Sequence, residues 1–215
     1  LQDKALQQAY LGHGHHKTIG NETSFDEKIR RAITEACHLL GEPEPLEVER
    51  KFLVEPPAKI PGECSSSRIE QIYLLPLGEE VRRVRKRTQQ SASVYTLTSK
   101  VHLSAGVNIE KETPLTGEEY LQLVQTQRDP KRNTVEKIRH CFIHNRRVYE
   151  LDEYIGRLAG LWILEAEVEN LADELSFPPW LTLQREVTHA KDYSNHNLAL
   201  IAAAGASLSD LSPSR

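Results

Sequence analysis

Charged side chains of one sign recur at every second position in several short segments. Arg83, Arg85 and Arg87 are spaced in this way, and so are Glu165 and Glu167. Because alternate residues of a strand share a face, each run would place like charges side by side, where they repel one another. An anion lying across the arginines, and a cation held by the glutamates, would relieve that repulsion. The spacing therefore points to a polyphosphate and a metal ion as ligands.

The same alternation continues along most of the chain, with charged residues on one face of each segment and apolar residues on the other. The expected strands are 46–54, 69–75, 80–88, 93–101, 107–113, 134–143, 147–154 and 161–169. A half-exposed sheet with a solvated charged face would explain any one of them. Whole strands of a single sign favour a charged face that points inward, which a protein tolerates only when the charges are paired or ligand-bound.

Eight antiparallel strands can close into a barrel with room for a small ligand. We therefore expect an α+β fold, an eight-stranded antiparallel closed β-barrel with flanking helices. One helix should begin after Ser24, which has the capping-box spacing with Glu27, and run over 25–40. A second should run from Thr116 to about Gln127, and a third from near Asn195 through 198–204.

Composition limits the classes of partner. The 215 residues carry a net charge of -4, whereas a nucleic-acid-binding protein usually shows a basic excess. Cys37, Cys64 and Cys141 are too few and too far apart for a disulfide scaffold, which fits a reducing compartment. No apolar run approaches the roughly 20 residues of a membrane span. We expect a cytoplasmic protein with no transmembrane segment and no specific nucleic-acid partner.

Glu47, Glu49 and Lys51 match the ExExK signature of the CYTH superfamily, whose members are also called triphosphate tunnel metalloenzymes. ExExK alone is a weak signal, because glutamate and lysine are common, but the order of the later motifs makes it specific. These motifs are Gln71-Ile72-Tyr73-Leu74, Arg83-Val84-Arg85, Thr96-Leu97-Thr98-Ser99-Lys100, Ile109-Glu110-Lys111-Glu112, Lys137-Ile138-Arg139, Glu150-Leu151-Asp152 and Leu164-Glu165-Ala166-Glu167. The resemblance covers 46–205. Asn108 departs from it, since many relatives carry an arginine there.

The resemblance implies a triphosphate tunnel that hydrolyses a triphosphate, either inorganic triphosphate or a nucleoside or organic one, with Mg²⁺ or Mn²⁺. The implied metal ligands are Glu47, Glu49, Glu165 and Glu167. The implied phosphate-binding residues are Lys51, Arg83, Arg85, Lys100, Lys137 and Arg139, and Arg87 on the same face would extend them. Glu110, Glu112, Glu150 and Asp152 are candidates for catalysis, by holding a second metal or orienting water. The alternative is a non-catalytic module that binds a nucleotide or a phosphoinositide head group in signalling or membrane trafficking.

The first 45 residues differ from the rest. Parts of 12–31 resemble the end of a P-loop nucleotide-binding domain that precedes CYTH in a subset of the superfamily, of the TRPL translocation defect protein type. No GxxxxGK[ST] motif occurs here, so we expect 1–45 to be the C-terminal remnant of such a domain with its linker. We expect it to be dispensable for chemistry, its 25–40 helix covering outward apolar residues such as Phe52 and Trp162. His13, His15 and His16 fit a solvated loop better than a metal site, and 206–215 fits a disordered tail.

Overall fold

The computed structural model describes residues 6, 8–12, 17, 19–20, 25–40 and 46–204. The expected Ser24 cap, the loop histidines and the 206–215 tail lie outside these residues. The described helices and strands follow the sequence-based expectation closely, with one additional strand near the C-terminus.

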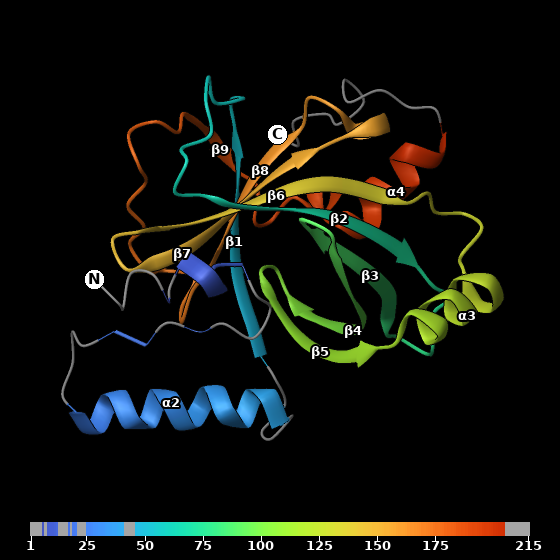
Figure 1. Cartoon of the computed structure of the whole chain (residues 1–215), viewed down its shortest axis with the longest axis horizontal. Coiled ribbons are helices and arrows are strands. Elements are labelled where there is room, and N and C mark those ends of the chain that lie inside the picture. The colour runs from blue at the N-terminus through green and yellow to red at the C-terminus, as the bar shows by residue number, and fades with distance from the viewer. Residues whose placement is uncertain are drawn as a thin grey trace.

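Eight strands close into an antiparallel barrel (Figure 1). They are β1 (Leu46–Val54), β2 (Ser65–Tyr73), β3 (Val81–Gln89), β4 (Ala92–Ser104), β5 (Val107–Leu115), β6 (Val135–His144), β7 (Arg147–Tyr154) and β8 (Trp162–Glu167). Their order runs β5-β4-β3-β2-β6-β7-β8-β1, and β1 pairs with both β8 and β5, which closes the ring. The added strand β9 (Leu183–Glu186) pairs with β1 further along. The expected eight-stranded closed barrel is confirmed.

The β4–β5 turn completes the barrel at Gly106. The backbone N–H of Glu49 donates to the carbonyl oxygen of Gly106 at 2.9 Å. Gly106 has a φ of +75°, and a Cβ there would lie 2.8 Å from the backbone oxygen of Glu49. Glycine tolerates both the positive φ and the close approach. This turn therefore fixes the backbone of Glu49, one of the expected metal ligands.

Two helices close faces of the barrel. Helix α3 (Gly117–Gln127) has Thr116 as its N-cap with the expected capping box to Glu119. Its Tyr120 packs against Leu74, against Val84 of β3 and against Tyr95 of β4, whose ring centroid lies 4.8 Å away. Helix α4 (Asn195–Ala204) contributes Leu198 and Ala199 to the core at one end of the barrel.

The barrel interior changes character along its length. At the end next to α4, the inward positions are the apolar residues Leu53, Tyr73, Val135, Tyr154 and Ile163. Further along the same strands the inward positions become charged. Because residues two apart share a face, the apolar and charged residues belong to one inner surface, and α4 with its neighbours plugs one end of it.

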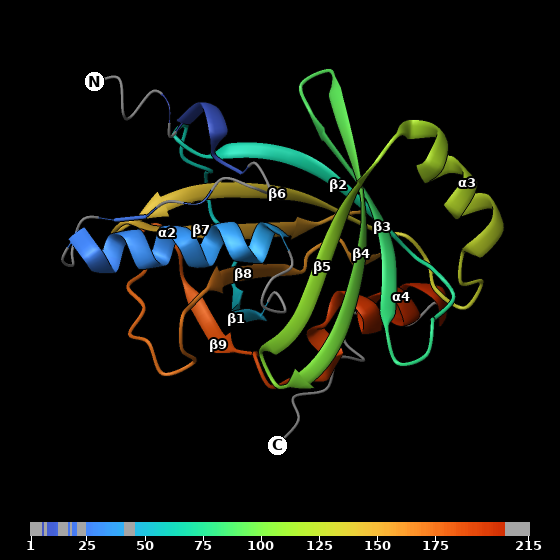
Figure 2. The same ribbon diagram turned by 90° about the horizontal axis from the view of Figure 1, so that it is seen from below.

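The outer apolar face of β1 and β6–β8 is covered by the segment 170–183, which corrects our expectation for helix α2 (Phe25–Leu40). Phe177 packs against Phe52, with ring centroids 5.1 Å apart, and Trp180 packs against Phe142 at 5.0 Å. Helix α2 instead leaves Phe25 75% exposed and lies apart from this face (Figures 1 and 2). The segment 170–183 carries no strand or helix pattern, so the sequence did not reveal its covering role.

Among the described residues, no helix has the length and apolar character needed to cross a membrane. Cys37, Cys64 and Cys141 are free thiols, as expected from their spacing.

The two phenylalanines give a direct test of which segment covers the barrel. Phe177→Ala should lower the free energy of unfolding by about 2 kcal/mol, because it removes a partly buried ring from an aromatic cluster. Phe25→Ala should change it by less than about 0.5 kcal/mol, because that ring is exposed. Urea denaturation followed by circular dichroism measures both. A larger loss for Phe25→Ala than for Phe177→Ala would contradict the described packing.

Candidate active site

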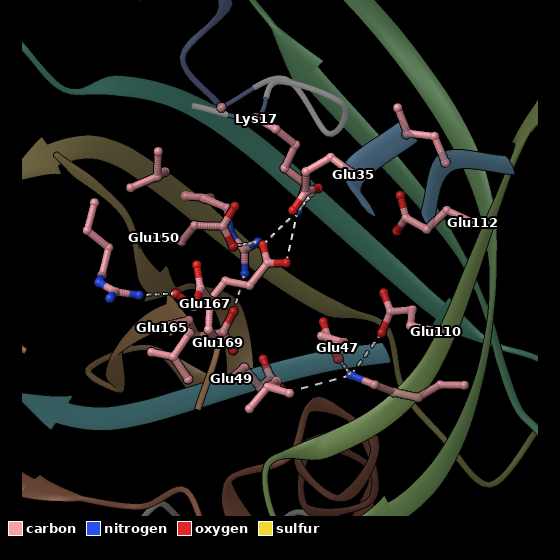
Figure 3. A pocket seen from close by; sticks show the side chains of 18 of the residues that line it. Lys17, Glu35, Glu47, Glu49, Glu110, Glu112, Glu150, Glu165, Glu167 and Glu169 are labelled. Carbon is pink, nitrogen blue, oxygen red and sulfur yellow. Dashed lines mark hydrogen bonds and ion pairs between the residues drawn. The ribbon is translucent and has the colours of Figure 1, made fainter. Parts of the chain in front are cut away.

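The charged part of the barrel interior opens into a cavity of about 1100 Å³. The barrel residues on its wall include thirteen of the expected site residues: Glu47, Glu49, Lys51, Arg83, Arg85, Arg87, Lys100, Glu110, Glu112, Arg139, Glu150, Glu165 and Glu167. Figure 3 shows the carboxylates converging from several strands. The alternation along each strand therefore brings residues far apart in sequence into one site.

On the wall formed by β1, β4 and β5, Lys100 joins three carboxylates. Its Nζ lies 2.5 Å from Glu47, 2.8 Å from Glu110 and 3.6 Å from Glu49. Arg83 also donates to Glu110, at 3.1 Å. Burial favours the neutral form of Glu110, but Arg83 and Lys100 outweigh it and hold its pKa at about 2. Glu110 is therefore an ionised acceptor at neutral pH.

Lys51 of β1 and Arg139 of β6 share Glu165 of β8. The Nζ of Lys51 lies 2.6 Å from Glu165 and 3.2 Å from Glu49, which links the carboxylates of β8 and β1. Arg139 donates to Glu165 at 2.6 Å and also to Glu150. The expected metal ligand Glu165 is thus held by two cations in this structure.

Lys137 and Asp152 are placed differently from our expectation. We expected Lys137 to bind phosphate and Asp152 to act in catalysis, but both side chains are fully buried and neither lines the cavity. They bond to each other, and Arg139 donates to both carboxylate oxygens of Asp152 at 2.7 Å. Burial and the neighbouring Arg139 lower the pKa of Lys137 to about 8. The buried Lys137–Asp152 pair therefore lies below the cavity wall, and Asp152 holds the guanidinium of Arg139 in place.

Three arginines of β3 keep N–H groups without an acceptor among the described residues. These are Nε of Arg83, Nε of Arg85 and Nη2 of Arg87, all of them buried atoms. Buried donors are almost always satisfied in folded proteins, and arginine donors match phosphate oxygens in geometry and charge. The even-numbered residues of β3 face outward, as the alternation requires. Arg82, for example, donates a hydrogen bond to Gln127 on α3. An anionic ligand would satisfy the unmet donors on the inner face.

The carboxylates of β1 and β8 fit a hard divalent cation. Glu49 and Glu167 are directly opposite each other in the strand register. Burial, with repulsion from Glu49 and Glu110, raises the pKa of Glu47 to about 8, so the cations nearby do not fully compensate its charge. Carboxylate oxygens are the ligands that Mg²⁺ and Mn²⁺ prefer.

These carboxylates are not already gathered around one point. Within the part of the chain that the structure describes, no group of three or more acidic, histidine or cysteine side chains has the arrangement of a metal site. The reason is visible in the ion pairs, since Lys51 and Lys100 lie between the carboxylates of β1 and their neighbours. Metal binding would require these lysines to move.

Several residues at the site were not expected. Asn195, at the start of α4, lines the cavity and accepts a hydrogen bond from the hydroxyl of Tyr154 at 2.7 Å. Asn108, the one departure from the sequence resemblance, donates to Glu47 at 3.3 Å, so this position supplies a neutral amide. Lys17 contacts Glu167 across 150 positions, a relation that no local sequence pattern could reveal.

The chain is similar in sequence and structure to several known proteins. No profile of a known protein family matches the chain. An inorganic triphosphatase of Nitrosomonas europaea is 32% identical over 164 residues, covering 72% of this chain and 97% of that protein. The crystal structure of a hypothetical protein superposes with a TM-score of 0.50 at 30% identity, covering 72% of this chain and 97% of that one. The crystal structure of an inorganic triphosphatase gives a TM-score of 0.49 at 31% identity, with 72% and 94% covered.

The identity to the curated relative, together with its almost complete coverage, is enough to establish the family, and the closed barrel with its charged interior agrees with it. The chain belongs to the CYTH superfamily of triphosphate tunnel metalloenzymes.

Proposed function

We propose that this chain hydrolyses inorganic triphosphate inside the charged cavity. The observation that carries the proposal is the row of buried arginine N–H donors on β3, which face the cavity and have no acceptor within the described part of the chain. They lie across from carboxylates suited to a divalent cation, and a polyphosphate with a bound cation satisfies both sets. The curated relative, an inorganic triphosphatase, supports the same reaction.

The basic residues of the cavity would bind different parts of the triphosphate, depending on the strand that carries them. Arg83, Arg85 and Arg87 would donate to phosphate oxygens from β3, and Arg139 would do so from β6, two strands along. Lys51 and Lys100 would turn from carboxylates to phosphates when the ligand enters. Phosphoryl transfer needs positioning and charge neutralisation more than covalent help, which is what fixed cations around the chain of phosphates provide.

The carboxylates would hold the cation and the attacking water. The superfamily implies a divalent metal, and we propose Mg²⁺ or Mn²⁺ on Glu47, Glu49 and Glu167, with Glu165 nearby. When bound, the ion supplies neutralisation of phosphate charge. Glu110, Glu112 and Glu150 line the cavity and can accept a hydrogen bond from water. Glu110 is held ionised by Arg83 and Lys100 in this structure, with a pKa of about 2, which suits it to orient a water.

Two parts of our sequence reading remain proposals. One is that residues 1–45 derive from a preceding P-loop domain, of the TRPL translocation defect protein type, in a cytoplasmic protein. The other is the alternative function, a module that binds a nucleotide or phosphoinositide head group without turnover.

A substrate panel separates catalysis from binding. Phosphate release should be measured with inorganic triphosphate, ATP, GTP, thiamine triphosphate and pyrophosphate, each with Mg²⁺ and with Mn²⁺. We expect inorganic triphosphate to give the highest kcat/KM. Binding of inorganic triphosphate without phosphate release, under either ion, would contradict the proposal.

The parity of β3 predicts which basic residues bind the substrate. Arg83→Ala and Arg85→Ala should each weaken triphosphate binding by about 10- to 100-fold, because each removes charge-assisted hydrogen bonds to phosphate. Arg82→Ala and Lys86→Ala should leave binding within about twofold, because these side chains point outward to Gln127 and Glu70. Calorimetric titration of triphosphate into the four variants tests this. Equal losses at all four positions would mean that β3 does not line the binding site.

The proposed metal site predicts that turnover depends on a divalent cation and on the carboxylate of Glu49. Excess EDTA should abolish turnover, and Glu49→Gln should lower kcat by at least about 100-fold, because an amide is a poorer ligand for a hard cation. Glu70→Gln is the matched control, since Glu70 lies on the outer face of β2 near Arg68 and Lys86. Phosphate release measures activity, and circular dichroism checks the fold. A well-folded Glu49→Gln protein with the wild-type rate would refute the assignment.

A further inference from the structure

A buried amide joins one of the proposed metal ligands to a histidine near the end of β4. Asn108 of β5 lies directly opposite Glu47 of β1 in the strand register, and directly opposite His102 of β4 on its other side. Its Nδ2 lies 3.3 Å from Oε2 of Glu47, and its Oδ1 lies 3.1 Å from Nδ1 of His102. The three side chains therefore form one row of hydrogen bonds across three neighbouring strands.

The direction of each hydrogen bond in this row follows from the carboxylate. An ionised carboxylate accepts hydrogen bonds but cannot donate them, so the atom of Asn108 that faces Glu47 must be the amide nitrogen. The carbonyl oxygen of Asn108 then faces His102 and accepts from it, so Nδ1 of His102 carries a proton. Because Asn108 is only 7% exposed, water has little access to this carbonyl. His102 therefore fixes the orientation of the amide, and the amide fixes Glu47.

Asn108 differs in charge from the lysine that also contacts Glu47. The Nζ of Lys100 lies 2.5 Å from the same oxygen, Oε2, and a cation at that position repels an incoming metal ion. Figure 3 shows Glu47 close to Glu110, which Lys100 contacts as well. When the lysine turns away, these two carboxylates are left to repel each other. The uncharged amide of Asn108 can stay on Glu47 while a divalent ion binds, and so can keep this carboxylate in place.

We propose that Asn108 and His102 are positioning residues for the divalent cation, Asn108 by holding Oε2 of Glu47 and His102 by holding the amide of Asn108. The inference rests on the proposed metal role of Glu47. Neither Asn108 nor His102 lines the cavity, so both act through Glu47. Residues that orient a metal ligand without binding the ion typically change metal affinity by about 10- to 100-fold.

Titration of Mn²⁺ alone into the whole chain tests the positioning without relying on turnover, with the electron paramagnetic resonance signal measuring the free ion. Asn108→Leu should bind Mn²⁺ about tenfold more weakly than the wild type, because leucine keeps the branched shape but offers no hydrogen bond. His102→Leu should bind it about threefold more weakly, because the carbonyl of Asn108 loses one hydrogen bond. His102→Asn should bind within about twofold of the wild type, because its amide can donate from the position of Nδ1.

Coupling between the two residues separates positioning from a general loss of stability. Because His102 acts through Asn108, the protein with both leucine substitutions should bind Mn²⁺ no more weakly than Asn108→Leu alone. Asn197→Leu is the matched control. It removes an amide that donates to the carbonyl oxygen of Lys191 at 2.9 Å, away from the cavity wall, and should leave the Mn²⁺ affinity unchanged.

Glu49→Gln, titrated in parallel, checks the metal site itself. If Glu49→Gln weakens Mn²⁺ binding but Asn108→Leu and His102→Leu do not, the positioning role is refuted while the proposed function stands. The same holds if the two single losses add in the double variant, or if Asn197→Leu loses as much affinity as Asn108→Leu. His102 is exposed, so its variants decide the question even where Asn108→Leu does not fold. A wild-type protein that binds no Mn²⁺ would overturn the positioning role and the proposed metal site together.

Discussion

Charge enclosed in a barrel must be balanced inside it, and this requirement shapes the whole site. Isolated charges are very costly away from water, and removing one partner of a buried pair leaves the other uncompensated. Here Lys100 binds Glu47 and Glu110, and Arg139 binds Asp152 and Glu165. Many of the acidic and basic residues that would bind a cation and a polyphosphate are thus paired with one another in this structure. Under the proposed function, ligand binding would be an exchange of partners, in which phosphates replace carboxylates and a metal ion replaces lysines.

The two ends of the barrel serve different purposes because the inward positions differ along each strand. Near α4 the inward residues are apolar, such as Val135 and Tyr154, and they form a core that stabilises the fold. Two inward positions further along lie Arg139 and Glu150, which line the cavity. A barrel with an apolar plug at one end has its charged cavity accessible from the other end.

The sequence predicted which face each strand turns inward but not the depth of each residue. Period two is a local property, so Arg83 and Arg85 could be assigned to the cavity without knowing the fold. Nothing local separates Lys137 from Arg139, yet the first is buried beneath the cavity and the second lines it. The alternation within each strand also could not predict contacts between segments that are distant in sequence. The pairing of Lys17 with Glu167, and the covering of Phe52 by Phe177, depend on where the irregular segments lie in three dimensions.

The exchange of partners is tested most directly by a crystal structure of the protein with inorganic triphosphate and Mn²⁺, which scatters strongly enough to be located. The account predicts phosphate oxygens on Arg83, Arg85 and Arg139, and Mn²⁺ on carboxylates of β1 and β8, with the Lys100–Glu47 pair broken. Triphosphate bound outside the barrel, with that pair intact, would contradict it.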